Sequence, residues 1–213
     1  MHALSSNEQL VLLDLCKSCE RLTVTDVSRR MGLSGMGASK LLARLEAQRI
    51  LASERIGSAK RFRIRYESAF VRRFLAFLLH KEAEGVRPQL RMWIGEIRRL
   101  EADIGIVFGS ALRLDDPRDL DVLVVLERER VRSLNATLEE LEAISPRAIH
   151  LVRQTRRDFV KNALLDPVVR DAARGVVAFG YDVFVEVMAD VARVKYGGVV
   201  FEEGTPRVDP DPS

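Results

Sequence analysis

The stretch FGSALRLDDPRDLDVLVVL, residues 108 to 126, decides the fold of the C-terminal half. Its last five residues are all apolar, which is typical of a strand buried on both faces. Asp119 and Asp121 come directly before that run, and alternate residues of a strand share a face, so both carboxylates point the same way. Two carboxylates at the head of a buried strand need a compensating partner.

The residues before this strand suggest what the partner is. Residues 104 to 108 predict another strand, which ends at the sharp turn Gly109-Ser110. Glycine lets a phosphate approach the backbone closely, and the following amide and the Ser110 hydroxyl can donate hydrogen bonds to it. Two carboxylates on one face suit Mg²⁺, which retains waters and accepts phosphate oxygens. We therefore expect a metal-bound phosphate between the two segments.

A simpler alternative exists for the same motif. Asp115, Asp116 and Pro117 can merely reverse the chain, with Asp119 as the cap of the turn. That interpretation explains the turn but not the second carboxylate, Asp121, in phase with the first.

FGS followed by DLDVLVV resembles the signature of the polymerase β-like nucleotidyltransferase superfamily, particularly its minimal nucleotidyltransferase branch. The resemblance covers roughly residues 88 to 190, with 146–152 similar to the family's later strand and 176–180 to its closing strand. It implies that Gly109 and Ser110 hold a nucleoside triphosphate (NTP) and that Asp119 and Asp121 are catalytic ligands of two Mg²⁺ ions. These ions would align an attacking hydroxyl with the α-phosphorus and stabilise the pyrophosphate leaving group.

This sequence departs from the family pattern in three places. The loop between Gly-Ser and the first aspartate is shorter than is common, and Leu114 stands where a glycine is frequent. The third carboxylate, expected on the later strand, is replaced in phase by His150, which can ligate a metal or accept a proton only when neutral. His150 could equally be a polar residue at a strand edge. Asp158 is a second candidate for the third acid, although its position also suits a helix cap.

The N-terminal half predicts short helices followed by a basic hairpin. Residues 26–31 read as a helix ended by Gly32, and a third helix follows Ser34. Two helices joined by a glycine turn make a helix-turn-helix unit. Residues 50–56 and 61–66 read as the two strands of a hairpin with one apolar and one arginine-rich face. The predicted apolar stripe of the third helix is Met36, Leu41, Leu42 and Leu45.

This order, with TVTDVSRRMGLSGMGASKLLARLEAQRIL before the hairpin, resembles the winged helix-turn-helix domains of bacterial and archaeal transcription regulators over about the first 68 residues. In such domains the third helix enters the major groove and the hairpin lies against the backbone or minor groove. The hairpin has no acidic residue between positions 55 and 65, which suits phosphate neutralisation. The same charges could merely solvate the hairpin, and winged helices also act as protein adaptors. By position, the implied DNA contacts are Ser39, Lys40, Arg44, Lys60, Arg61 and Arg63.

Charge separates the two halves of the chain. Residues 1 to 87 hold 16 lysines and arginines against 9 acids, whereas residues 88 to 213 hold 18 against 22. The first half favours a polyanion partner. Neither a membrane-spanning stretch nor a signal peptide is evident, so we expect a cytoplasmic protein with no membrane partner. A homodimer is expected because winged helices usually read a two-fold site.

These patterns predict an α+β or mixed α/β fold in four parts. They are a winged helix-turn-helix domain at 1–68, a connecting helix and linker at 69–87, a nucleotidyltransferase-like domain at 88–200 and a flexible tail at 201–213.

Winged-helix proteins of archaea fused to minimal nucleotidyltransferase domains have the same order, and three functions are compatible with it. One is a DNA-binding, Mg²⁺-dependent enzyme that transfers NMP from NTP to a hydroxyl of a protein or small molecule. Another is a transcription regulator whose degenerate domain only binds the nucleotide. The third is an antitoxin paired with a cognate toxin.

Overall fold

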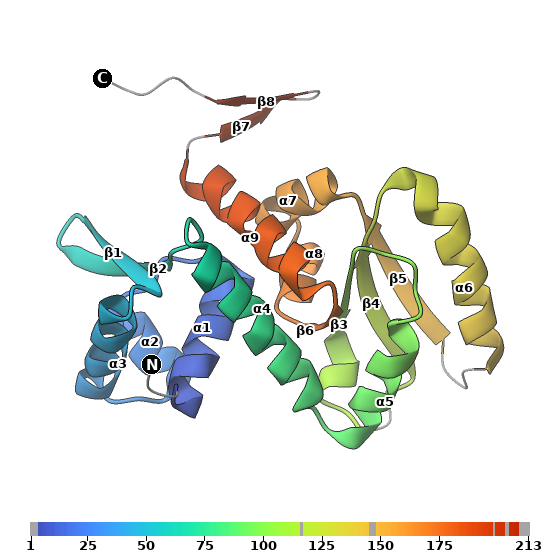
Figure 1. Cartoon of the computed structure of the whole chain (residues 1–213), viewed down its shortest axis with the longest axis horizontal. Helices are drawn as coiled ribbons and strands as arrows, with labels where there is room; N and C mark the ends of the chain where they lie inside the picture. The colour runs from blue at the N-terminus through green and yellow to red at the C-terminus, as the bar shows by residue number, and fades with distance from the viewer. Residues whose placement is uncertain (1–3, 116, 145–147, 198, 203–204, 209–213) are drawn as a thin grey trace. The chain divides into compact units, whose positions relative to one another are not determined.

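The computed structural model describes residues 4–115, 117–144, 148–197, 199–202 and 205–208. The chain forms two compact units, Met1–Leu78 and Leu79–Ser213. Figure 1 shows the mixed α and β architecture that the sequence predicts, which confirms the fold class. The predicted boundaries at 68 and 87 stay predictions, and the helix α4 (Ala69–Glu84) crosses the division between the units.

The N-terminal unit has the element order of a winged helix-turn-helix. Three helices are followed by an antiparallel hairpin and then by the start of α4. The elements are α1 (Ser6–Ser18), α2 (Val24–Met31), α3 (Gly35–Ala47), β1 (Leu51–Ile56) and β2 (Ala59–Ile64).

Local signals in the sequence fix the ends of these helices. The Thr23 hydroxyl accepts from the Asp26 amide while the Asp26 carboxylate accepts from the Thr23 amide, so a capping box begins α2. Gly32 ends α2 with a φ of 62°, a left-handed conformation that suits glycine. Ser34 then caps α3 through the Gly37 amide. The turn predicted between the two helices is therefore confirmed.

The hairpin is held to the helices through β2. Phe62 and Ile64 are buried, and the backbone of Phe62 exchanges two hydrogen bonds with Leu22, at 2.8 and 3.0 Å. Arg61 and Arg63, which alternate with them, lie on the other face of the strand, as the alternation predicts.

The C-terminal unit is built around a four-stranded mixed sheet in the order β5-β4-β3-β6. The strand β4 is antiparallel to β3 and parallel to β5, while β3 and β6 are antiparallel. The strands are β3 (Ile104–Phe108), β4 (Asp119–Val125), β5 (Ala148–Gln154) and β6 (Val176–Phe179).

Helices cover both faces of this sheet (Figure 1). Apolar residues of α5 (Pro88–Ile97) and α6 (Val131–Ile144) share one core cluster with Leu120, Val122 and Val124 of β4. The alternate residues, Leu123 and Val125, are buried on the other face. The helices that contact the sheet beyond α6 are α7 (Arg156–Leu165), α8 (Pro167–Ala173) and α9 (Tyr181–Tyr196).

The chain after α9 includes a short hairpin of β7 (Val199–Glu202) and β8 (Thr205–Val208). These strands overlap the segment 201–213, which was predicted to be a flexible tail. Residues 203–204 and 209–213 of that segment lie outside the described residues. The flexibility of the tail stays a prediction. Within the described ranges, no helix is both long enough and apolar enough to cross a membrane.

Candidate functional site

The two aspartates of the opening motif begin β4. Asp119 and Asp121 point to the same side of the sheet, while Leu120 between them is buried on the opposite side, only 4% exposed. Both carboxylates are partly exposed, at the start of the strand, whereas Val122 to Val125 are buried. The two carboxylates therefore lie on one face of β4, as the alternation of the sequence predicts.

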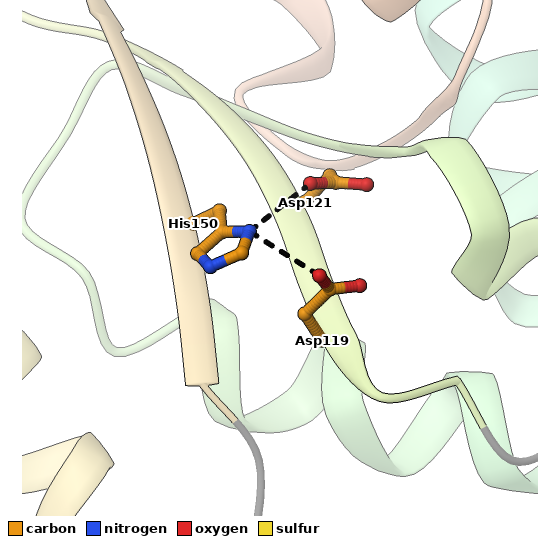
Figure 2. A group of neighbouring side chains, drawn as sticks. All are labelled: Asp119, Asp121 and His150. Carbon is orange, nitrogen blue, oxygen red and sulfur yellow. Dashed lines mark ion pairs between the residues drawn. The ribbon is translucent and has the colours of Figure 1, made fainter.

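His150 joins the two aspartates from the neighbouring strand. The parallel register places its Cα opposite that of Asp121. Figure 2 shows its Nδ1 directed at both carboxylates, 3.4 Å from Asp119 Oδ2 and 3.7 Å from Asp121 Oδ1. The sequence predicted that His150 would be in phase with the pair, and the structure brings the three side chains together.

The donor set fits a divalent cation. One ligand atom from each of Asp119, Asp121 and His150 lies within 4.8 Å of the others. Among the described residues, neither carboxylate has a lysine or arginine within ion-pairing distance. Two clustered carboxylates without a lysine or arginine beside them in this part of the structure repel each other, and a bound cation would remove that repulsion.

Asp158 does not belong to this group. Its carboxylate accepts a hydrogen bond from the Thr155 hydroxyl at 2.7 Å, and its amide donates to the same hydroxyl at 3.1 Å. Asp158 is thus the reciprocal partner of the cap that starts α7, which favours the capping interpretation over a third acid. Asp116 of the alternative turn lies outside the described residues, and Asp115 is exposed.

The glycine-serine turn approaches the carboxylates closely at Gly109. It begins a short 3-10 helix, η1 (Gly109–Leu112), with a φ of 73°. A Cβ atom built on Gly109 would lie 2.3 Å from Asp121 Oδ2. A side chain at position 109 would therefore collide with the Asp121 carboxylate, which explains in this structure why the motif needs glycine. Ser110 follows at the same corner and is partly exposed.

Arg87, which no pattern in the sequence singled out, holds the end of η1 and the residues that follow it. The Arg87 guanidinium donates to the carbonyl oxygens of Ala111 at 2.7 Å and Leu112 at 3.3 Å, and also to that of Leu114. It also pairs with Asp115 at 3.4 Å. An arginine before a proline carries no local signal of this role, because its partners lie 24 to 27 residues further along the chain.

The predicted DNA contacts of α3 differ in their surroundings. Ser39 and Lys40 are exposed. Arg44 is instead engaged by Glu8 of α1, with Arg44 Nε 2.6 Å from Glu8 Oε1. Glu8 is only 1% exposed; burial raises its pKa, but hydrogen bonds from Ser5 and Arg44 outweigh burial, and the pKa lies below its ordinary value. Glu8 was missed because a glutamate in a first turn is most simply a capping residue.

The predicted contacts of the hairpin are also partly engaged. Lys60 Nζ lies 2.8 Å from Glu46, and this hydrogen bond, with a second from Ser53, lowers the pKa of Glu46. Arg63 pairs with Glu67 at 3.3 Å. Arg61 donates to the Arg21 carbonyl at 3.5 Å. By contrast, Arg55 is exposed and has no ion-pair partner in the described part of the chain, although it was not among the predicted contacts.

Comparisons with known proteins add one similar structure. No family model and no curated protein matches the sequence. Among solved structures, the adhesin competence repressor AdcR from Streptococcus pyogenes aligns with 45% of this chain at 19% identity and a TM-score of 0.35. The match covers 66% of AdcR, slightly less than two thirds of its length. The resemblance of the N-terminal unit to a winged helix-turn-helix is one of element order.

Proposed function

We propose that this protein binds DNA through its N-terminal unit and that its C-terminal unit transfers a nucleoside monophosphate from an NTP to a hydroxyl of a protein or small molecule. The observation that carries the second part is the contact between the two motifs: Gly109 lies against Asp121, and Asp119 and His150 lie beside it. A phosphate held at the turn would be next to the carboxylates.

Each residue of the site has a role in this proposal. Gly109 leaves room for the triphosphate, and the Ser110 hydroxyl donates a hydrogen bond to it. Asp119 and Asp121 hold a divalent cation, for which the resemblance to nucleotidyltransferases implies Mg²⁺. When bound, such a cation neutralises phosphate charge and orients the reacting oxygens. Arg87 is a positioning residue, because it fixes the loop that joins the turn to β4.

DNA binding is supported by the exposed surface of α3 and the hairpin. Lys40 and Arg55 are exposed there without an acidic partner in the described residues, so they can neutralise phosphates at no cost in internal ion pairs. A homodimer would present two such surfaces to a two-fold DNA site.

A second candidate function is a regulator that binds nucleotide without turnover. His150 favours it, because an imidazole stands where the resembled family has a third carboxylate and supplies no negative charge for a second cation. Both candidates share the nucleotide site and differ only in transfer.

The test is transfer of label to an acceptor. The full-length protein is incubated with Mg²⁺ and each α-labelled NTP in host lysate, beside an Asp119→Asn/Asp121→Asn variant. An Asp171→Asn/Asp182→Asn variant loses the same charge from exposed positions on α8 and α9 and serves as the matched control.

Label that is lost in the first variant and kept in the control supports the enzyme and identifies its acceptor. Absence of label with retained NTP binding by calorimetry favours the regulator. Absence of both contradicts any nucleotide function for the site. Acceptor labelling of a small helical protein encoded beside this one would point to a toxin partner.

A further inference from the structure

We propose that Asp119, Asp121 and His150 bind a single divalent transition-metal ion of the Zn²⁺ kind in preference to Mg²⁺. The inference deepens the proposed function and rests on it for the use made of the metal. Binding itself is argued from the geometry and chemistry of the three side chains.

The spacing of the ligand atoms fits one ion. His150 Nδ1 is 3.4 Å from Asp119 Oδ2 and 3.7 Å from Asp121 Oδ1. Ligand atoms about 2.0 to 2.2 Å from a tetrahedral Zn²⁺ are about 3.3 to 3.6 Å from one another. The three side chains thus need only small rotations to reach one common ion.

The donor types favour a transition metal. Imidazole nitrogen is a ligand for Zn²⁺ and its neighbours, whereas Mg²⁺ takes oxygen ligands at near-ideal octahedral positions. Two carboxylates and one histidine are three protein ligands, the number that zinc sites with an open position have. A site made of three carboxylates would not favour Zn²⁺ over Mg²⁺ through its donor types.

The charge of the group limits it to one ion. Asp119 and Asp121 together compensate one divalent cation, and an imidazole adds no negative charge for another. No further aspartate or glutamate joins the group within the described ranges. A two-ion arrangement therefore lacks the third acid that it needs.

The site is open enough to load and to accept a further ligand. The side chain of His150 is 61% exposed, and those of Asp119 and Asp121 are 37% and 30% exposed. The residue paired with Asp119 on β5 is Ala148, whose methyl group leaves space on this edge. A water or a phosphate oxygen can take the remaining position on the ion.

Calorimetry on the metal-free, full-length protein tests the proposal, with Zn²⁺ and Mg²⁺ titrated separately. The variants are His150→Ala, His150→Asp and, as a matched control, His80→Ala, which removes an exposed imidazole from α4. We expect the unmodified protein to bind one Zn²⁺ at least about tenfold more tightly than Mg²⁺, and His150→Ala to lose at least about tenfold in Zn²⁺ affinity. His80→Ala should leave Zn²⁺ affinity unchanged.

The His150→Asp variant makes the test reciprocal, because a third carboxylate should raise Mg²⁺ affinity and lower the preference for Zn²⁺. The visible spectrum of bound Co²⁺, a spectroscopic substitute for Zn²⁺, should change in both position-150 variants but not in His80→Ala. Equal affinity of the unmodified protein for the two metals, or unchanged Zn²⁺ affinity in His150→Ala, would overturn the proposal.

These outcomes are separable from those of the transfer assay. Zn²⁺ binding that depends on His150, without any label transfer, upholds the metal site and removes the enzyme. Label transfer by a protein without a preference for Zn²⁺ upholds the enzyme and removes this inference.

Discussion

In the hairpin of the N-terminal unit, three of the five basic side chains between residues 55 and 65 are already paired with acids. The acids at the start of β4 lie together with no lysine or arginine paired to them in the described part of the chain. Both regions look strongly charged in the sequence. In the hairpin, two acids, Glu46 and Glu67, pair with three of the five basic side chains. At the start of β4, His150 is the basic side chain that faces the two carboxylates among the described residues.

The sequence of a region indicates the sign of its charge, whereas the tertiary structure determines which of those charges are paired. A charge that is already paired must break that pair before it can bind a ligand, which reduces its net contribution. Two clustered carboxylates that are not paired with a lysine or arginine among the described residues gain more from a ligand of opposite charge. We therefore expect a cation to bind at the start of β4 more readily than DNA phosphates bind to the paired side chains of the hairpin.

Gly109→Ala should have the largest effect, because the added methyl group would meet the Asp121 carboxylate directly. A residue other than glycine at positive φ costs about 1 to 2 kcal/mol, and here the new methyl group also displaces the Asp121 carboxylate. We expect that loss of stability in urea unfolding together with at least about a tenfold loss of cation affinity by calorimetry.

Gly57→Ala is the matched control for that change. Gly57 has a φ of 61° and no atom within 4 Å of a built Cβ, so it carries the backbone strain alone. Unchanged cation affinity in Gly57→Ala is expected. An equal loss in both variants would mean that Asp121 is not the cause.

Arg87→Ala should be next in size, since it releases the loop between the glycine turn and the carboxylates. Leaving the carbonyls of Ala111 and Leu112 without their donor should cost about 1 to 2 kcal/mol. Hydrogen exchange of residues 110–114 should accelerate. Arg87→Lys keeps the charge but not the planar fork, so it should be intermediate; full protection in the lysine variant would show that charge alone holds the loop.

Glu8→Gln tests a compensated pair as a function of pH. The pKa of Glu8 is lowered in the folded protein, so its contribution is present above the ordinary glutamate pKa and is lost as pH falls through the folded value. The variant should be about 1 kcal/mol less stable at neutral pH and should lose less stability on acidification. Urea unfolding across pH measures this, with exposed Glu139→Gln as the control; identical pH profiles for Glu8→Gln and the unmodified protein would contradict it.

Lys60→Ala should have the smallest effect on stability, within about 0.5 kcal/mol, because its pair with Glu46 is partly exposed. DNA affinity provides the comparison. Lys40→Ala should reduce the slope of log affinity against log salt by about 0.9, the value for one phosphate contact, and Lys60→Ala by less. A larger slope change for Lys60 than for Lys40 would reverse the proposed ranking of paired and unpaired charges.

Local patterns predicted much of the fold and part of the site. Strand alternation placed Asp119 and Asp121 on one face, and it placed His150 in phase with them. The stripe of α3 was only partly right: Leu41, Leu42 and Leu45 are buried, but Met36 is 70% exposed. Met36 lies in the first turn, where Ala38 is the residue that faces the core.

Long-range partners could not be predicted in the same way. The contact of Glu8 with Arg44 spans 36 residues, and those of Arg87 span 24 to 27. Helix and strand periodicity report which face a residue occupies, but not which distant element comes to lie against that face. Which charges are paired therefore depends on which distant elements meet, and periodicity does not report that.

The register that sets His150 opposite Asp121 also has an evolutionary consequence. Histidine and aspartate codons differ only in their first base, so a point mutation at codon 150 would exchange the nitrogen ligand for a carboxylate at the same place on the sheet. In a lineage of such proteins, metal preference could therefore change without a change of fold.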